Sequence, residues 1–145
     1  MTGKYLADTN LLVYAYDRSE AEKQPKALNI LDTLVKNGTG VLSAQVLAEF
    51  YTVVTRKIAA PLTTKEGHRS VGNYLSSWTV LNVTGPVVLE AVRGVRDHQL
   101  SFWDSMVWAT AKMNQVPVVL SEDFSDNSVI EGVRFVNPLV NDIFS

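Results

Sequence analysis

The 145-residue sequence contains no cysteine, which excludes disulfide bonds, zinc–thiolate sites and a cysteine nucleophile. This absence is compatible with a reducing cytosol, and we expect a cytoplasmic protein. The sequence also lacks any apolar run near the ~18 residues that a membrane-spanning helix needs, and its amino terminus predicts no signal peptide. We therefore expect no membrane association.

An excess of positive charge is missing as well. The formal net charge is −2 and the isoelectric point is about 5.6, whereas proteins that coat nucleic acids without sequence preference are usually basic. This balance still permits an enzyme that reaches phosphates through bound metal ions. A glycine-rich phosphate-binding loop is also absent, because Gly38-Thr39-Gly40 lacks the lysine and the spacing of a P-loop.

The composition that is present is globular, with 46% hydrophobic and 19% charged residues. The length predicts a single domain that covers residues 1–145. Short apolar segments predict five strands, at residues 4–8, 40–43, 79–83, 116–120 and 133–136. Helical patterns fill the intervals between them. Because the strands are apolar runs alternating with helices, we predict an α/β fold with a parallel sheet covered on both faces.

Several local signals predict where the helices begin and which face they bury. Capping boxes are predicted at Ser19-x-x-Glu22 and Thr63-x-x-Glu66, Pro25 suits a first helical turn, and Gly38 is expected to end a helix. The expected helices include 44–58, 63–77 and 87–95, with a further helix that begins at Ser101. Apolar residues at helical spacing predict the buried positions Leu28, Leu31, Leu34 and Val35; Leu47, Phe50, Tyr51, Val54 and Ile58; and Phe102, Met106, Ala109 and Met113.

Four acidic residues fall where the carboxyl ends of these strands are expected. Asp8 ends the first strand, and Asp123 follows the strand at 116–120. Glu49 and Asp104 lie in early turns of their helices. Ligands of open parallel sheets bind outside the carboxyl ends of the strands, so we predict that the four carboxylates converge there.

Each acid also has a simpler explanation. Asp8 could cap the following helix, and Glu49 could be a solvated surface residue. Asp104 could be the reciprocal member of a capping box with Ser101. Asp123 could form a local turn with the polar residues that follow it. Taken together, however, four acids at one edge of a sheet favour a shared site.

Electrostatics indicates what such a site would bind. Two unit charges ~4 Å apart repel by roughly 1 kcal/mol in water and ~4 kcal/mol at an effective dielectric constant of 20. A divalent cation would reverse this repulsion. Mg²⁺ or Mn²⁺ prefers oxygen ligands, which are what these acids offer. Such ions also acidify bound water, and a pair of them stabilises both oxygens of a phosphodiester displacement.

The motifs around these acids resemble the PIN-domain ribonucleases. They are Asp8-Thr9-Asn10, Ala48-Glu49-Phe50, Trp103-Asp104 and Ser121-Glu122-Asp123, and their order and spacing extend over nearly the whole chain. The length looks most like the VapC-type toxins of toxin–antitoxin pairs. The resemblance implies a PIN-like three-layer α/β/α sandwich with a central, mostly parallel sheet of four to five strands. It also implies Mg²⁺- or Mn²⁺-dependent cleavage of RNA.

The resemblance further implies a role for each site residue. Asp8 and Asp104 would be the central metal ligands, Asp123 would complete the site, and Glu49 would bind a second ion or position the attacking water. Thr9, Asn10 and Ser121 match polar positions that support the site in this family. The family also implies an RNA substrate, a homodimer and, for toxin members, a small inhibitory antitoxin protein.

Other residues and other functions remain open at this stage. Trp103 and Arg56 are candidates for contact with RNA, with core packing or a solvated surface as the alternatives. His68 and His98 are expected at the surface, because neither has a carboxylate or histidine at ligand spacing. One competing hypothesis is an aspartyl-phosphate phosphatase with Asp8 as nucleophile. Another is a catalytically inactive PIN-like module that binds a protein partner.

Overall fold

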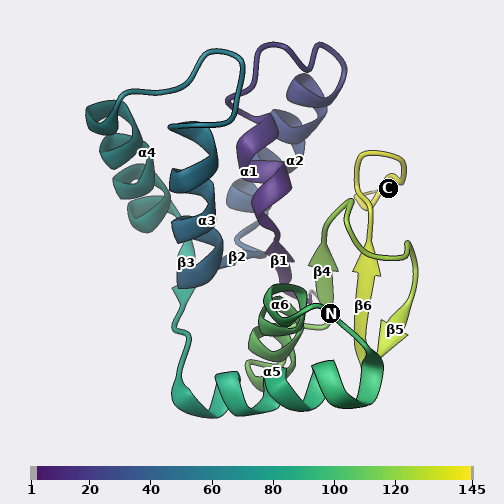
Figure 1. Cartoon of the computed structure of the whole chain (residues 1–145). Coiled ribbons are helices and arrows are strands. Elements are labelled where there is room, and N and C mark those ends of the chain that lie inside the picture. Colours follow the sequence, from purple (N-terminus) through teal and green to yellow (C-terminus); the bar gives the residue numbers. More distant parts are fainter. Residues whose placement is uncertain (1–2, 145) are drawn as a thin grey trace.

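Single strands alternate with pairs of helices through the first four strands, and two further strands follow, in the computed structural model, which describes residues 3–144 (Figure 1). The helices within this range are α1 Thr9–Tyr14, α2 Lys23–Asn37, α3 Ala44–Val54, α4 Thr64–Ser77, α5 Gly85–His98 and α6 Phe102–Met113. The strands are β1 Tyr5–Ala7, β2 Gly40–Ser43, β3 Thr79–Leu81, β4 Val118–Leu120, β5 Val129–Ile130 and β6 Val133–Val136.

The strands form one sheet in the order β3-β2-β1-β4-β6-β5. All neighbours pair in parallel except β5, which runs antiparallel to β6. The predicted mostly parallel sheet is therefore confirmed, but the expected count of four to five strands was too low. The additional strand β5 is only two residues long, which is too short to produce a pattern in the sequence.

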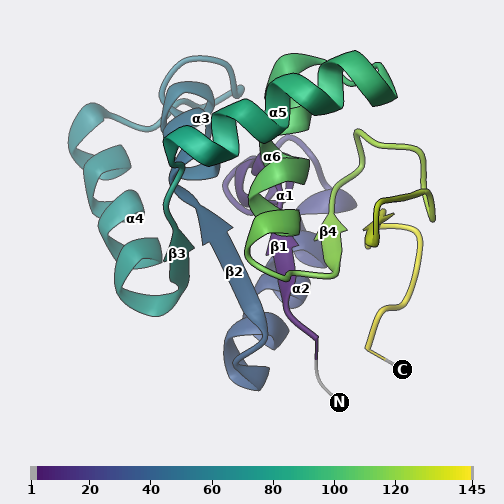
Figure 2. The same cartoon turned by 90° about the horizontal axis from the view of Figure 1, so that it is seen from below.

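Successive residues of the central strands point into two different cores. In β1, Leu6 belongs to the core under α5 and α6, whereas Ala7 belongs to the core under α1, α2 and α3. The same alternation occurs in β4 with Val119 and Leu120. Figure 2 shows α5 and α6 on one side of the strands and α1 and α2 on the other. Both faces of the sheet are covered, which explains why its strands read as continuous apolar runs.

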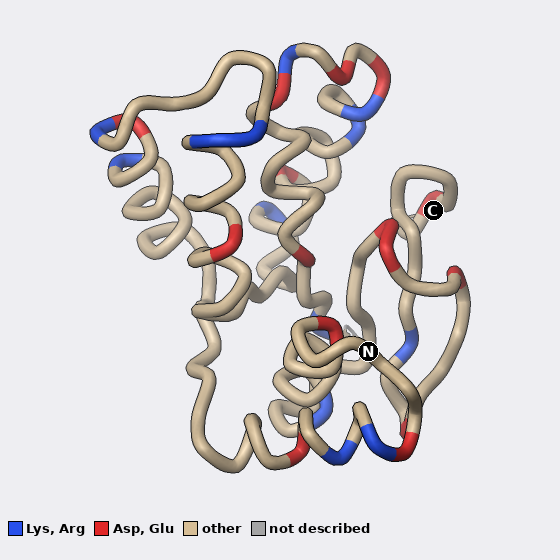
Figure 3. Tube along the Cα trace, in the orientation of Figure 1, with Lys and Arg blue, Asp and Glu red and all other residues tan. Residues whose placement is uncertain are grey.

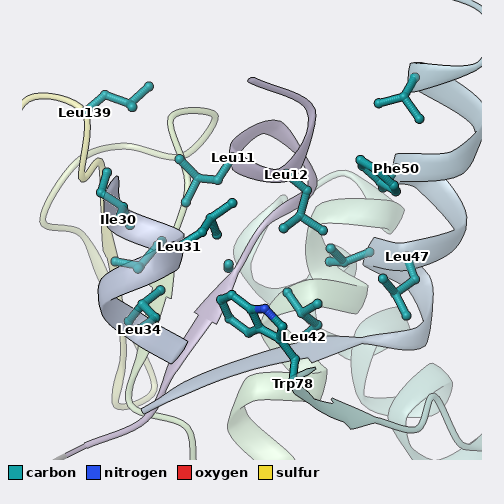
Figure 4. Packing of buried hydrophobic residues seen from close by; sticks show 14 of the residues in the cluster. Leu11, Leu12, Ile30, Leu31, Leu34, Leu42, Leu47, Phe50, Trp78 and Leu139 are labelled. Atoms are coloured by element: carbon teal, nitrogen blue, oxygen red, sulfur yellow. The ribbon is translucent and has the colours of Figure 1, made fainter. Parts of the chain in front are cut away.

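The core under α1, α2 and α3 gathers leucines around the indole of Trp78 (Figure 4). The buried face of α2 differs from the predicted one. Ala27, Ile30, Leu31 and Leu34 are buried, whereas Leu28 and Val35 are 49% and 43% exposed. The helix turns its 27/30/31/34 stripe toward the sheet, and the two exposed residues flank that stripe. In α6, Met113 is likewise exposed, because it lies in the last turn beyond the core.

Helix boundaries follow some of the predicted signals and not others. The capping box of Thr63 and Glu66 is present, and Gly38 ends α2 with a left-handed φ of 66°. The predicted box at Ser19 was wrong, because Ser19 bonds Asp17 instead and α2 begins without a side-chain cap. Pro25 nevertheless lies in the first turn of α2, as predicted.

Two helices differ in length from the prediction. Helix α3 ends at Val54 rather than near Ile58, because the chain turns at Thr55 and Lys57, although Ile58 is still buried. Helix α5 is longer than the predicted 87–95. Thr84 caps it by accepting a hydrogen bond from Val87 N, and it continues to His98.

The connections create a switch point in the middle of the sheet. The pairs α1–α2 and α3–α4 connect β1, β2 and β3 over one face, whereas α5–α6 connects β3 to β4 over the other. The strand order therefore reverses between β1 and β4. The carboxyl ends of two such strands form the crevice in which ligands of α/β proteins usually bind. Among residues 3–144, no helix is long and apolar enough to cross a membrane.

Candidate active site

Asp8 occupies the carboxyl end of β1 at this switch point. One of its carboxylate oxygens accepts a hydrogen bond from Thr9 N at 2.8 Å and caps α1, and the other accepts from the Ser121 hydroxyl at 2.8 Å. The residue is only 6% exposed. Burial raises the pKa of Asp8 to about 6, against the opposing effect of these two hydrogen bonds. Asp8 is therefore both a helix cap and a buried acid at the site.

The loop after β4 is bonded to the first turn of α1. The side-chain amide of Asn10 donates to Ser121 Oγ at 3.0 Å and to Asp123 Oδ2 at 3.2 Å. Ser121 Oγ also accepts from Asp123 N at 3.1 Å. Asp123 therefore accepts a hydrogen bond from a residue of α1. The simpler explanation, a turn within its own loop, does not account for this contact. Two of the residues predicted to support the site, Asn10 and Ser121, make these contacts.

Glu49 projects from the second turn of α3 and is half-buried. Burial raises its pKa, and the charges of Asp104 and Asp123 raise it further. Gln45, one turn earlier, donates both to Glu49 Oε1 at 2.9 Å and to the Trp103 carbonyl oxygen at 3.0 Å. Gln45 therefore connects Glu49 to the start of α6. The sequence analysis missed this residue, although its position four residues before Glu49 was a usable signal.

Asp104 lies in the first turn of α6, where Ser101 caps the helix. Ser101 Oγ accepts a hydrogen bond from Asp104 N at 3.3 Å. The reciprocal bond from the carboxylate to Ser101 N is not formed among the described residues, so this is not a complete capping box. Burial raises the pKa of Asp104, Ser101 lowers it, and the charge of Asp123 raises it.

The four acids influence one another electrostatically. Asp8 is affected by Asp123 and Glu49, Glu49 by Asp104 and Asp123, and Asp104 by Asp123, each in the direction of a raised pKa. In Figure 3, the acidic positions of α3, the β1–α1 junction, α6 and the loop after β4 surround the same region of the trace. Within residues 3–144, however, no three Asp, Glu or His side chains are close enough to ligate one metal ion together.

The donor chemistry of this edge nevertheless fits a hard divalent cation. Mg²⁺ is usually held by only one or two carboxylates and keeps several waters, so a tight cluster of three is not required. Asp8 and Asp123 supply such oxygens on the two adjacent strand ends. In addition, Thr9 Oγ1 and Asn10 Oδ1 are buried without a hydrogen-bond partner in the described part of the chain. Buried oxygens of this kind are usually satisfied by water or an ion.

Thr9 also lies near Glu49. Its hydroxyl lowers the pKa of that carboxyl, but it does not reach hydrogen-bonding geometry, so its oxygen is left without a partner in residues 3–144. Thr9, the third residue predicted to support the site, therefore lies beside Glu49 with a hydroxyl that has no hydrogen-bond partner among the described residues.

A second group of side chains holds the same loop from its other side. Tyr14, one turn after Asn10 on α1, donates a hydrogen bond to Glu122. Lys23 pairs with Glu122 at 3.1 Å and also bonds the Tyr14 hydroxyl at 3.2 Å. The loop that carries Asp123 is thereby fixed to α1 and to the start of α2.

Asp126 takes no part in this group. It accepts hydrogen bonds from Asn137 N and from the Asn141 side chain, both at 2.8 Å, and these bonds lower its pKa. It holds the turn after β6.

The other candidates from the sequence are dispersed. Trp103 is 60% exposed beside Asp104, and Arg56 is exposed just beyond the end of α3. His68 is exposed on α4, as expected. His98 is partly buried and has a carboxylate partner, because its Nε2 lies 2.6 Å from Glu131 Oε2. The two residues are 33 positions apart, a separation at which sequence spacing gives no signal.

The fold and the acidic edge together define a three-layer α/β domain with a polar site at its switch point. The chain belongs to the PIN domain family, whose sequence profile matches residues 5–125. No match was found among curated protein sequences.

Solved structures share this fold at low sequence identity. The VapC20 toxin of Mycobacterium tuberculosis, described as cleaving the sarcin–ricin loop, aligns with a TM-score of 0.70 and 19% identity, covering 90% of this chain and 99% of VapC20. A toxin–antitoxin complex from Klebsiella pneumoniae aligns with a TM-score of 0.67 and 17% identity over 93% and 98% of the two chains. FitAB bound to a DNA fragment aligns with a TM-score of 0.66 and 20% identity, over 97% and 99%.

Proposed function

We propose that this protein is a divalent-metal-dependent endoribonuclease that hydrolyses phosphodiester bonds of RNA. The observation that carries the proposal is the set of four carboxylates, from four separate segments, at the carboxyl edge of the sheet, where the charges of neighbouring acids help to raise the pKa of Asp8, Glu49 and Asp104. A protein gains no stability from such crowding, so the arrangement favours a functional role. Membership of the PIN domain family is consistent with this role.

Asp8, Asp104 and Asp123 are the residues that would hold the ion, with Glu49 as ligand to a second ion or as the group that positions water. When bound, Mg²⁺ or Mn²⁺ supplies a Lewis acid and a water that is acidic enough to attack at neutral pH. The chain's own residues prepare the site. Ser121 and Asn10 orient Asp8 and Asp123 through hydrogen bonds, and Gln45 orients Glu49.

We further propose that the protein is the toxin of a toxin–antitoxin pair. This is supported by its structural similarity to proteins described as VapC20, a Klebsiella pneumoniae toxin–antitoxin complex and DNA-bound VapBC of Salmonella typhimurium. In this proposal, the protein forms a homodimer, is bound by a small antitoxin protein and cleaves RNA in the cytoplasm.

The phosphatase alternative is weaker. An aspartyl-phosphate enzyme would need a second acid two residues after its nucleophile to serve the leaving group, and that residue is Asn10. Both carboxylate oxygens of Asp8 also accept hydrogen bonds within the fold, which lowers their nucleophilicity.

The test is RNA cleavage by protein purified free of any partner, with Mg²⁺ or Mn²⁺ and with a chelator. We expect metal-dependent cleavage by the wild type and none by Asp8→Asn. The matched control is Asp32→Asn, which removes an exposed acid of α2 that forms an ion pair with Lys36. Equal activity in wild type and Asp8→Asn would remove the acidic site from the mechanism. Metal binding without cleavage of any RNA would favour the inactive module.

A further inference from the structure

An apolar pocket of about 580 Å³ adjoins the acidic site between α3 and the start of α6. Its apolar walls include Trp103, Met106, Val53 and Val83. Glu49 and Gln45 form part of its lining, so the pocket adjoins the site through Glu49, one of the four acids. Its size is within the ~300–1,000 Å³ range of pockets that bind small organic groups.

Trp103 is exposed in a way that the other tryptophans are not. Its side chain is 60% exposed, whereas Trp108 and Trp78 are 0% and 9% exposed. The indole is nonetheless held in place, because it packs edge-on against Phe102 with ring centroids 5.0 Å apart. Its carbonyl oxygen accepts the hydrogen bond from Gln45. A fixed, solvent-facing aromatic ring beside charged groups is a typical stacking platform for nucleobases.

Gln45 connects the pocket to the acids. It is 8% exposed and uses its amide hydrogens to join Glu49 to the Trp103 backbone. Its Oε1 is buried without a hydrogen-bond partner in the described chain. The position of the indole and the position of Glu49 are therefore set by the same side chain.

We propose that this pocket receives an unpaired nucleobase of the RNA, next to the phosphodiester that lies at the acids. The inference rests on the proposed ribonuclease function and specifies the form of its substrate. A base fits because it is planar and largely apolar on its faces, and because every base can stack on an indole. The attached backbone then extends from the acidic end, where a metal ion offsets the negative charge, toward Lys57, whose ammonium group suits a neighbouring phosphate.

The pocket also indicates which RNA conformations are accepted. In a duplex, the bases are stacked within the helix and cannot enter a side pocket, whereas loops and single strands can present a splayed base. The enzyme is therefore expected to select unpaired nucleotides. Lys57, which follows the candidate Arg56 in the sequence, is part of the pocket lining.

Binding of a ten-nucleotide single-stranded RNA to Asp8→Asn protein, followed by tryptophan fluorescence, tests the proposal without cleavage. We expect the RNA to quench the fluorescence of the exposed Trp103, and a blunt duplex of the same sequence not to do so. Trp103→Ala should weaken binding roughly 5- to 150-fold, corresponding to ~1–3 kcal/mol per stacked base. Trp103→Phe should retain most of the affinity, and Leu89→Ala, an exposed apolar residue of α5, should retain all of it.

Cleavage kinetics, measured in protein that retains Asp8, test the pocket independently of the proposed ribonuclease function. We expect Trp103→Ala to raise KM with little change in kcat. Normal KM and unchanged RNA affinity in Trp103→Ala would overturn the pocket and leave the nuclease intact. Trp103-dependent binding without metal-dependent cleavage would support the pocket and overturn the nuclease. Equal quenching by duplex RNA, or a loss confined to binding of a protein partner, would also overturn the pocket.

Discussion

The Ser121 hydroxyl donates a hydrogen bond to Asp8 Oδ2 at 2.8 Å, across 113 positions of sequence. The bond joins the carboxyl ends of β1 and β4, the neighbouring strands between which the order of the sheet reverses. Ser121 is 1% exposed. The buried hydroxyl of Ser121 therefore stabilises the ionised form of the buried Asp8 carboxylate.

Ser121→Ala should destabilise the protein more at pH 8 than at pH 4. The substitution removes a donor from the ionised form of Asp8, so the pKa of Asp8 should rise still further. At pH 8, we expect a loss of about 1–3 kcal/mol, the usual cost of a buried group left without its partner. Urea denaturation at the two pH values measures the difference. The control is Ser76→Ala, which removes an exposed hydroxyl of α4. Equal losses at both pH values would contradict the prediction.

Asp8→Asn should stabilise the metal-free protein above pH 6 and flatten its dependence on pH. The pKa of Asp8 is about 6 in the folded protein against an ordinary value of 3.8, so the folded state binds the proton more tightly. Protonated Asp8 therefore contributes favourably to the free energy of unfolding, by up to about 3 kcal/mol. This contribution is complete below pH ~4 and is lost as the pH rises through ~6.

Denaturation of both proteins from pH 3 to 8 provides the measurement. Glu49 and Asp104 have raised pKa values too, so Asp8→Asn should reduce the slope without removing it. An unchanged slope in the variant would contradict the assignment to Asp8.

Divalent cations should raise the melting temperature. A ligand at ~100-fold over its dissociation constant adds about 2.7 kcal/mol, which corresponds to several degrees for a domain of this size. Asp104→Asn should abolish the shift produced by Mn²⁺ or Mg²⁺, whereas Asp32→Asn should keep it. If Asp104 acted only in capping α6, its replacement by Ala would lower the free energy of unfolding by ~1 kcal/mol and leave the metal response intact.

Gln45→Met should impair turnover more than substrate binding. Methionine fills similar space but cannot donate to Glu49, so we expect kcat to fall about tenfold, equivalent to ~1.4 kcal/mol. Loss of the donor should also raise the pKa of Glu49 and move the acid limb of the pH–rate profile upward. The matched control is Gln24→Met. Gln24 lies on α2, and its side chain donates a hydrogen bond to the Ala15 carbonyl oxygen. A profile that does not move would indicate a purely structural role for Gln45.

Gly94→Ala should destabilise the contact between α5 and α6. A Cβ at Gly94 would lie 2.2 Å from Ser105 Oγ and 2.7 Å from the Trp108 ring, and overpacking of this kind costs about 1–3 kcal/mol. Gly72→Ala is the control, because nothing lies within 4 Å of its Cβ position in α4. That change should stabilise the protein by up to ~1 kcal/mol through helix propensity. Thermal denaturation compares the two, and a neutral Gly94→Ala would show that α6 shifts freely.

The positions of Asp8 and Asp123 in the fold could be predicted from sequence because both follow strand ends, which apolar runs mark clearly. Asp8 directly follows Ala7, and Asp123 follows the Leu120 end of β4. Contacts between distant segments were not predictable in this way. Neither the bond from Gln45 to the Trp103 carbonyl nor the pairing of His98 with Glu131 has a periodic signature. The face of α2 was also misjudged, because its leucines and valines extend beyond the stripe that the sheet covers.

The insertion of β4 beside β1 has a consequence for protein synthesis. During translation, Asp8, Glu49 and Asp104 are all added to the chain before residues 118–123 are made. Until that last segment docks, Asp8 lacks the Ser121 hydroxyl and Asp123 is absent. The site can therefore form only after β4 and the loop that follows it have been synthesised and have docked beside β1.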